Sequence, residues 1–287
     1  MPVALFGVLA AAGCGGNSAA SQIRIPPAKG RPTLPPRDAV VMAQEDGALA
    51  VALAARPAAS GIELIATIVG PDNQGKDGLQ VEFGKRNVTK TGKPCGSGCY
   101  SAQLPASGPG EVSVRVSGRT LEFKLPARWP PDATALVRRA TAVFNRLDSV
   151  RYREALASSP QTGISTLWTQ VAPNRLEYSI RGGADGIVIG GTRWDRATPS
   201  ARWVKSAIQP ITAPAPLWGS RNTNARLLSR TKDSYVVSLL NRSIPAWFTI
   251  SLDRKLLPRS LDMTAAAHFM HHDYLSFNRP LQIEPPR

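Results

Sequence analysis

The residues of this chain best suited to chemistry are its few cysteines and histidines, which fall into three groups. Cys14 stands near the N-terminus, Cys95 and Cys99 share a glycine-rich segment, and all three histidines lie between positions 268 and 272. Thiolates and imidazoles act as nucleophiles, bases and metal ligands. What each group does therefore depends on the residues that surround it.

Cys14 follows twelve uncharged residues, PVALFGVLAAAG, and precedes the sequence GGNS. The apolar run is shorter than the roughly 20 residues that span a bilayer and is typical of a processed signal. Bacterial lipoprotein signals end in small residues before one cysteine, which is then acylated, for example with palmitate. We predict a signal peptide over 1–13 and a lipid on Cys14 that anchors the protein to the extracytoplasmic face of the cell membrane. The alternative is a hydrophobic segment with a chance cysteine, because Ala11 stands where such signals usually carry Leu.

Cys95 and Cys99 lie in the sequence KPCGSGC, on either side of a Gly-Ser-Gly turn. Such a turn brings two Cβ atoms within bridging range, and an extracytoplasmic compartment is oxidising. We predict a disulfide whose small loop stabilises the fold by about 2 kcal/mol. The alternative is a copper site, although such sites also need histidine or methionine nearby.

The histidines form the sequence HFMHH at positions 268–272. In a strand, His268, Met270 and His272 would share one face, and His271 would point to the other. Imidazole and thioether groups this close together could bind copper or zinc. A metal site at these three residues is one prediction, and a solvated tail is the alternative.

The sequence offers little to an enzyme or a nucleic-acid-binding protein. It has no G-x-S-x-G segment and no histidine outside 268–272, so a catalytic triad is not expected. The net charge is +15, but the basic residues are scattered and do not form a nucleic-acid footprint. We expect no enzyme activity, no cofactor besides the covalent lipid, and no nucleic-acid partner. Scattered arginines permit weak attraction to anionic headgroups.

Periodicity divides the rest of the chain into a tether and two mainly β units. Residues 14–37 are rich in Pro, Gly, Ser and Ala, which predicts a flexible tether. Between 38 and 126, seven short apolar runs separated by turn residues predict an immunoglobulin-like β-sandwich. In residues 131–287, Asp132 can cap a helix that runs to about Leu147, and short strands follow. One helix and a long antiparallel meander predict a curved sheet wrapped around that helix.

Several segments of the second unit form a recognisable pattern. They are the opening helix at 133–147, YSI at 178–180, DGIVIGGTRWD at 185–195, WVKS at 203–206, and the closing strand at 256–264 with its extension to 270. In these segments, residues 131–287 resemble the LolA/LppX/LprG-type lipoprotein-carrier superfamily. The resemblance implies a half β-barrel with a helix as its lid, whose concave face holds acyl chains or contacts lipid.

The seven strand-like runs of residues 38–126 are similar to immunoglobulin-like extracytoplasmic modules of the YtkA/FixH type. Such modules occur on the ends of actinobacterial copper-transport proteins related to CopC and CopD, whose C-terminal extensions combine them with a LolA-like unit. Copper binding of the CopC type uses an N-terminal histidine with further His or Met ligands. The first unit offers only Met42 for that role.

The function hypothesis is a non-enzymatic, membrane-anchored lipoprotein that binds a lipid or another apolar ligand. The aromatic residues of the second unit are the candidates for lining the ligand space, or else they fill the core. They are Trp168, Trp194, Trp203, Trp218, Trp247 and Phe248, and we expect Trp168 and Trp247 to face the ligand. The alternatives are an extracytoplasmic copper- or metal-handling protein that uses His268–His272, and a structural adaptor that contacts other envelope proteins.

Overall fold

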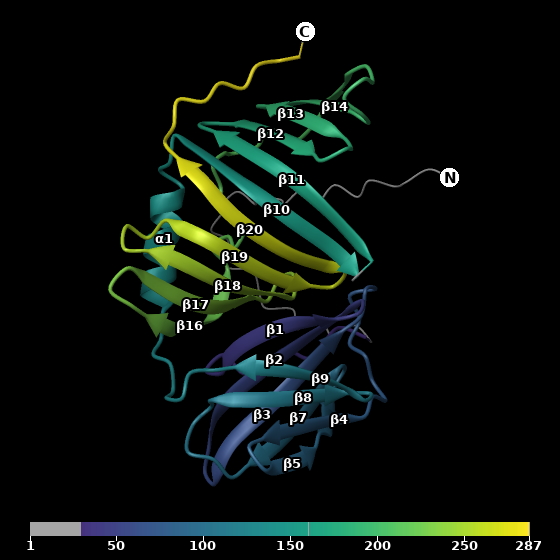
Figure 1. Cartoon of the computed structure of the whole chain (residues 1–287), viewed down its shortest axis with the longest axis vertical. Coiled ribbons are helices and arrows are strands. Elements are labelled where there is room, and N and C mark those ends of the chain that lie inside the picture. The colour runs from purple at the N-terminus through teal and green to yellow at the C-terminus, as the bar shows by residue number, and fades with distance from the viewer. Residues whose placement is uncertain (1–29, 160, 287) are drawn as a thin grey trace, which may run out of the picture.

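The computed structural model describes residues 30–159 and 161–286, which form two β-rich units stacked on each other (Figure 1). The predicted signal peptide, Cys14 and the tether as far as residue 29 lie outside the described residues. Within the described ranges, no helix combines the length and the apolar character needed to cross a bilayer.

The N-terminal unit is a sandwich of two antiparallel sheets. Its strands are β1 (Val40–Asp46), β2 (Leu49–Ala58), β3 (Gly61–Val69), β4 (Val81–Lys85), β5 (Val88–Thr91), β6 (Lys93–Gly96), β7 (Cys99–Leu104), β8 (Glu111–Val116) and β9 (Arg119–Lys124). One sheet has the order β1-β2-β3-β7-β6, and the other has the order β5-β4-β8-β9. The predicted sandwich is confirmed. The apolar pattern does not predict β5 and β6, because both strands are short and largely exposed.

Strand β2 explains how the sandwich also contacts the second unit. Val51 and Leu53 point into the sandwich core, whereas Ala50, Ala52 and Ala54 point to the opposite side. On that side the alanines belong to a buried cluster with Leu240, Trp247 and Phe269 of the second unit. Because the strand is apolar on both faces, it contributes to two cores at once. Its small outer side chains let the two units approach closely.

The C-terminal unit is one antiparallel sheet with a single helix, α1 (Thr134–Phe144). Its strands are β10 (Ser149–Ser159), β11 (Thr162–Val171), β12 (Arg175–Ile180), β13 (Asp185–Ile189), β14 (Thr192–Arg196), β15 (Val204–Ala207), β16 (Asn222–Arg230), β17 (Ser234–Asn241), β18 (Ala246–Asp253), β19 (Pro258–Ala265) and β20 (His268–Phe277). The order is β15-β14-β13-β12-β11-β10-β20-β19-β18-β17-β16. Figure 1 shows the sheet turning between β19 and β12, with α1 against one side. The predicted mainly β fold with one packed helix is confirmed.

Helix α1 begins where the sequence predicts and ends earlier. The Asp132 carboxylate accepts a hydrogen bond from the Thr134 N–H at 2.9 Å, which satisfies one free donor of the first turn. The buried face of the helix consists of Val137, Ala140 and Phe144. These side chains pack into the core of the C-terminal unit.

Two segments expected outside the folded core belong to it. Residues 268–272, for which a solvated tail was one prediction, begin β20, which lies in the middle of the sheet between β10 and β19. Residues 30–37, which we call the strap, contact the second unit. The Pro35 carbonyl accepts a hydrogen bond from Arg242 at 2.7 Å, and the Pro36 carbonyl accepts one from Asn224 at 2.7 Å. The packed structure therefore begins before the predicted boundary at residue 38.

Candidate functional site

The two faces of the C-terminal sheet decide where each predicted site residue points. We call the face that packs against α1 the helix face, and Val150, Phe248 and Met263 lie on it. The opposite, outer face carries Trp247 and Phe269, which contact the N-terminal unit. Because successive residues of a strand alternate between faces, the strand register assigns the remaining side chains.

The predicted ligand-binding aromatics are divided between these faces. Trp168 is paired with Tyr152 on one side and Tyr178 on the other, so it lies on the helix face with Phe248. Trp194 occupies an outward position in the alternation of β14 and therefore lies on the outer face. Trp203 lies beside Arg196, whose guanidinium carbon is 4.6 Å from the centre of its ring. The aromatic residues predicted to bind the ligand therefore do not line one common space.

The expectation that Trp247 faces the ligand space is wrong. Its side chain is 2 % exposed and lies in the cluster between the two units. Phe248 takes the helix-face position instead, because neighbouring residues of β18 alternate. Trp218 fills the core: it is fully buried, and its Nε1 donates to the Thr141 hydroxyl of α1 at 2.8 Å.

A polar cluster, which the sequence does not reveal, is buried on the helix face. His272 Nε2 lies 2.9 Å from Glu154 Oε2, and both side chains are less than one tenth exposed. The Tyr152 ring stacks on His272 with 4.7 Å between ring centres, and Gln170 Nε2 donates to the Tyr152 hydroxyl at 3.3 Å. Burial, with a smaller contribution from the Glu154 charge, raises the pKa of Tyr152. Burial likewise raises the pKa of Tyr274, which packs against Tyr152.

Three polar atoms of this cluster have no hydrogen-bond partner among the described residues. They are Thr166 Oγ1, Trp168 Nε1 and His272 Nδ1. The strand register places Thr166 and His272 on either side of Glu154. An unpaired buried polar group costs about 1–3 kcal/mol, and each such group needs an explanation. The helix face of the C-terminal unit therefore holds three buried polar groups whose hydrogen-bonding capacity the described residues leave unused.

A second polar group lies further along the helix face, on β12 and β14. The Tyr178 hydroxyl donates to Asp195 Oδ1 at 2.8 Å, and Arg193 lies 2.7 Å from the same carboxylate. Burial and then Asp195 raise the pKa of Tyr178. Gly186 makes this arrangement possible, because a Cβ there would lie 2.1 Å from the Tyr178 ring.

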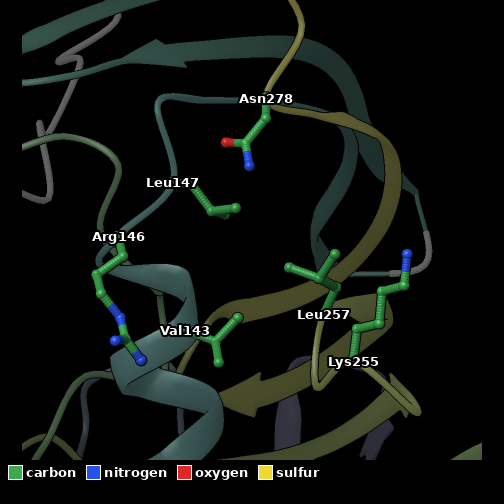
Figure 2. Close-up of a pocket in the computed structure, with 6 residues that line it drawn as sticks. All are labelled: Val143, Arg146, Leu147, Lys255, Leu257 and Asn278. Atoms are coloured by element: carbon green, nitrogen blue, oxygen red, sulfur yellow. The ribbon is translucent and has the colours of Figure 1, made fainter.

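A cavity of about 240 Å³ opens beside the C-terminal end of α1 (Figure 2). Its lining residues are Val143, Arg146, Leu147, Lys255, Leu257 and Asn278. Figure 2 shows Val143 and Leu147 on the helix side and Leu257 across from them, with Lys255 at one flank. Arg146 turns back toward the helix, where its Nε donates to the Ala142 carbonyl at 3.0 Å. The centre of the cavity is therefore apolar, and Lys255 supplies a charge at its edge.

The histidines of β20 have separate partners. His268, Met270 and His272 share the helix face, as predicted for a strand, and His271 lies on the outer face. The His268 ring lies 2.9 Å from a backbone carbonyl, whereas His272 faces Glu154. Over residues 30–159 and 161–286, no three His, Cys, Asp or Glu side chains gather into a group that could hold a metal ion. This geometry gives the predicted metal site no support.

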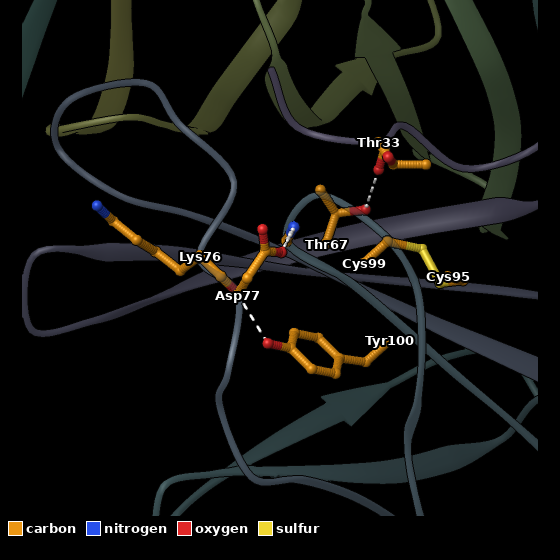
Figure 3. Close-up of a disulfide and its surroundings, with 8 residues drawn as sticks. Thr33, Thr67, Lys76, Asp77, Cys95, Cys99 and Tyr100 are labelled. Carbon is orange, nitrogen blue, oxygen red and sulfur yellow. Dashed lines mark hydrogen bonds between the residues drawn. A yellow bond between two sulfur atoms is a disulfide. The ribbon is translucent and has the colours of Figure 1, made fainter. Parts of the chain in front are cut away.

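The predicted disulfide between Cys95 and Cys99 is present and joins β6 to β7, with Cα atoms 5.0 Å apart (Figure 3). The Ser97 carbonyl, in the turn between the cysteines, accepts a hydrogen bond from the Thr33 N–H at 2.8 Å. The Thr67 hydroxyl donates to the Thr33 carbonyl at 3.0 Å. The disulfide hairpin and β3 thus both hold the strap in place.

Comparisons with known proteins add a likeness in structure. No family model and no curated protein matches the chain. Among solved structures, the chain is similar to the LolA superfamily protein NE2245 from Nitrosomonas europaea, with 9 % sequence identity and a TM-score of 0.26. The match covers 52 % of this chain and 94 % of that protein. A likeness at this TM-score assigns no function, so the function has to be inferred from the residues themselves.

Proposed function

We propose that this protein is a non-enzymatic lipoprotein, anchored to the extracytoplasmic face of the membrane, that binds a lipid or another apolar ligand. The observation that carries the proposal is the cavity at the end of α1, whose centre is apolar and whose edge carries Lys255. The sequence resemblance of residues 131–287 to lipoprotein carriers agrees with this function.

An apolar centre beside the Lys255 ammonium fits an amphiphile with a negatively charged head, such as a fatty acid. Each buried CH₂ group contributes about 0.8 kcal/mol, so the chain supplies affinity and Lys255 supplies orientation. The volume of about 240 Å³ is slightly below the roughly 300–1,000 Å³ of typical ligand pockets. We therefore expect an acyl chain to be only partly enclosed.

A displacement assay with a fluorescent fatty acid tests the cavity directly. Leu257→Trp should fill the cavity and weaken binding about tenfold, which corresponds to 1.4 kcal/mol. The matched control is Leu275→Trp, because Leu275 is 48 % exposed and does not line the cavity. Equal affinities of the two variants would contradict binding at this place.

The charge at the cavity edge gives a second test of the same function. Lys255→Glu should weaken the binding of a fatty acid and leave the binding of the matching neutral alcohol unchanged. Lys232→Glu, on the exposed turn between β16 and β17, is the control for a general charge effect. Equal losses in both variants would mean that Lys255 does not orient the ligand.

The proposed anchor is tested separately, through Cys14. Cys14→Ser should move the protein from the detergent-extracted membrane fraction to the soluble fraction, because stable anchoring needs acyl chains on that residue. Unchanged membrane association would contradict the lipoprotein part of the proposal and leave ligand binding open to its own test.

A structural envelope adaptor is the second candidate, and the packed core favours it. Phe144 and Trp218 are almost completely buried between α1 and the sheet, with ring centres 5.5 Å apart. An adaptor needs no ligand. If the parent protein binds no fluorescent fatty acid, and native mass spectrometry finds no co-purified lipid, the adaptor is the better explanation.

A further inference from the structure

A second cavity lies where the strap crosses between the two units. Its volume is about 350 Å³, which is within the roughly 300–1,000 Å³ of ligand pockets, and such pockets are frequent at domain interfaces. Residues 33–37 of the strap form one wall, the disulfide and Ile65 form another, and Arg242 closes the cavity from the C-terminal unit. This cavity is separate from the one at the end of α1.

Two arginines face this cavity without a carboxylate partner in the described part of the chain. Arg242 donates only to the Pro35 carbonyl, and Arg37 forms no ion pair. Glu63 also lines the cavity, but its carboxylate is already bonded to Arg56. Burial, and then the nearby charge of Arg37, lower the pKa of Arg242. Two like charges therefore meet here, and the carboxylate in the lining, Glu63, is already paired with a third arginine, Arg56.

We propose that this interface cavity binds a phosphate group that can carry two negative charges, either as the free anion or as the monoester headgroup of a phospholipid such as phosphatidic acid. Guanidinium groups offer planar forks of N–H donors that match phosphate oxygens. A carboxylate carries one negative charge, whereas a phosphate monoester carries up to two at neutral pH, which suits two unpaired arginines better. The apolar wall of Leu34 and Ile65 can accommodate the ester or acyl part of a lipid.

Inorganic phosphate is the first probe, and Arg37→Gln is the decisive variant because Arg37 is exposed and its side chain holds no other element. Arg37→Gln should weaken phosphate binding about tenfold in calorimetry, a typical loss for one charge-assisted pair. Arg181→Gln removes the same charge from an exposed turn of the C-terminal unit and should bind like the parent protein. Arg242→Gln should also lose affinity, and its thermal denaturation shows whether the strap stays in place.

Vesicles distinguish the two sources of phosphate. The protein, carrying Cys14→Ser so that no acyl chain anchors it, is floated with phosphatidic acid or phosphatidylcholine vesicles, with Arg37 and Arg181 unchanged and with Arg37→Gln or Arg181→Gln. If Arg37→Gln binds the anionic vesicles more weakly than Arg181→Gln does, the ligand is a lipid headgroup. If Arg37→Gln is weaker only in binding inorganic phosphate, the ligand is a free anion. If Arg37→Gln behaves like Arg181→Gln with both probes, or the parent binds neither, the inference is overturned. Leu257→Trp should leave phosphate binding unchanged, so this test and that of the first cavity fail independently.

Discussion

The N-terminal sandwich and the C-terminal sheet cover their inner faces in different ways. The sandwich closes one sheet with another, and its inward positions carry aliphatic and phenyl side chains such as Leu53, Leu64 and Phe83. The C-terminal sheet has eleven strands and one short helix. Besides the apolar residues that pack with α1, the helix face carries Tyr152, His272 and other aromatic or polar groups.

This difference extends to the hydrogen bonds of the buried side chains. Of the eight buried polar side-chain atoms that lack a hydrogen-bond partner within residues 30–159 and 161–286, six belong to the C-terminal unit, and one of the other two, Asp46 Oδ1, is in an ion pair with Arg119. A satisfied polar network makes a core rigid, whereas a partly satisfied one is costly. The comparison shows that more buried polar side-chain atoms remain without a hydrogen-bond partner in the C-terminal unit than in the sandwich.

The largest expected effect is the loss of a sandwich core aromatic. Phe83 is fully buried, so Phe83→Ala should lower the free energy of unfolding by about 3–5 kcal/mol. Trp168→Ala should cost less, because Trp168 is only partly buried on the helix face. Urea denaturation of both variants measures the difference. Equal costs would show that the two cores are packed equally tightly and would remove the distinction drawn above.

The next effect concerns the buried pair in the C-terminal unit. His272→Phe leaves Glu154 buried without its partner, and breaking such a pair typically costs about 3–5 kcal/mol. We expect the lower end, about 3 kcal/mol, because a phenyl ring can still stack on Tyr152. The double variant His272→Phe with Glu154→Leu should recover most of that loss, since an apolar replacement of a buried pair is often neutral. Urea denaturation that finds no recovery would mean that the two side chains act independently.

Much of the sandwich could be predicted from the sequence because its strands are short apolar runs separated by turn residues, and several of them, such as β8, alternate between apolar and polar residues. The seven predicted runs all became strands. In the C-terminal unit, the apolar pattern does not predict β14, β16 and β20. Their sequences, TRWDR, NTNARLLSR and HFMHHDYLSF, lack a regular apolar period, because polar side chains occupy parts of the helix face.

The candidate site was harder to predict for two physical reasons. His272 and Glu154 are 118 positions apart, so no local pattern connects them. Trp247 and Phe248 are adjacent and both buried, which means that alternation alone cannot decide which one faces the helix. Only the position of the N-terminal unit, packed on the outer face, settles the question. The disulfide was predictable because its geometry depends on a turn of three residues.

A smaller effect is expected for the disulfide in the sandwich. Replacing both cysteines by alanine, Cys95→Ala with Cys99→Ala, should lower the free energy of unfolding by about 2 kcal/mol, as expected for a loop of this length. The strap should become more accessible, because its Thr33 N–H is held by the turn between the cysteines. Hydrogen exchange at Thr33 measures that effect, and thiol labelling of the unreduced parent should find neither cysteine. Labelling of both would contradict the disulfide.

The smallest effect belongs to His271 on the outer face, the counterpart of the buried His272. Its Nδ1 lies 2.7 Å from Asp262, and its Nε2 lies 3.3 Å from Asp273. The hydrogen bond to Asp262, opposed by burial and aided by Asp273, raises its pKa above the ordinary value of about 6.5. The folded state therefore binds the proton more tightly than the unfolded state. The resulting stabilisation is complete below the unfolded pKa and is lost as pH rises through the folded pKa.

Because both partners of this pair are about half exposed, the stabilisation should be about 0.2–1 kcal/mol. His271→Asn should therefore destabilise the protein in acid solution and have little effect in alkaline solution, as urea denaturation on either side of the titration would measure. In an Asp262→Asn background the pH dependence should shrink, because the group that contributes most to the pKa shift is gone. An NMR titration of the His271 ring gives the pKa itself. A value at or below that of a free histidine would refute the assignment.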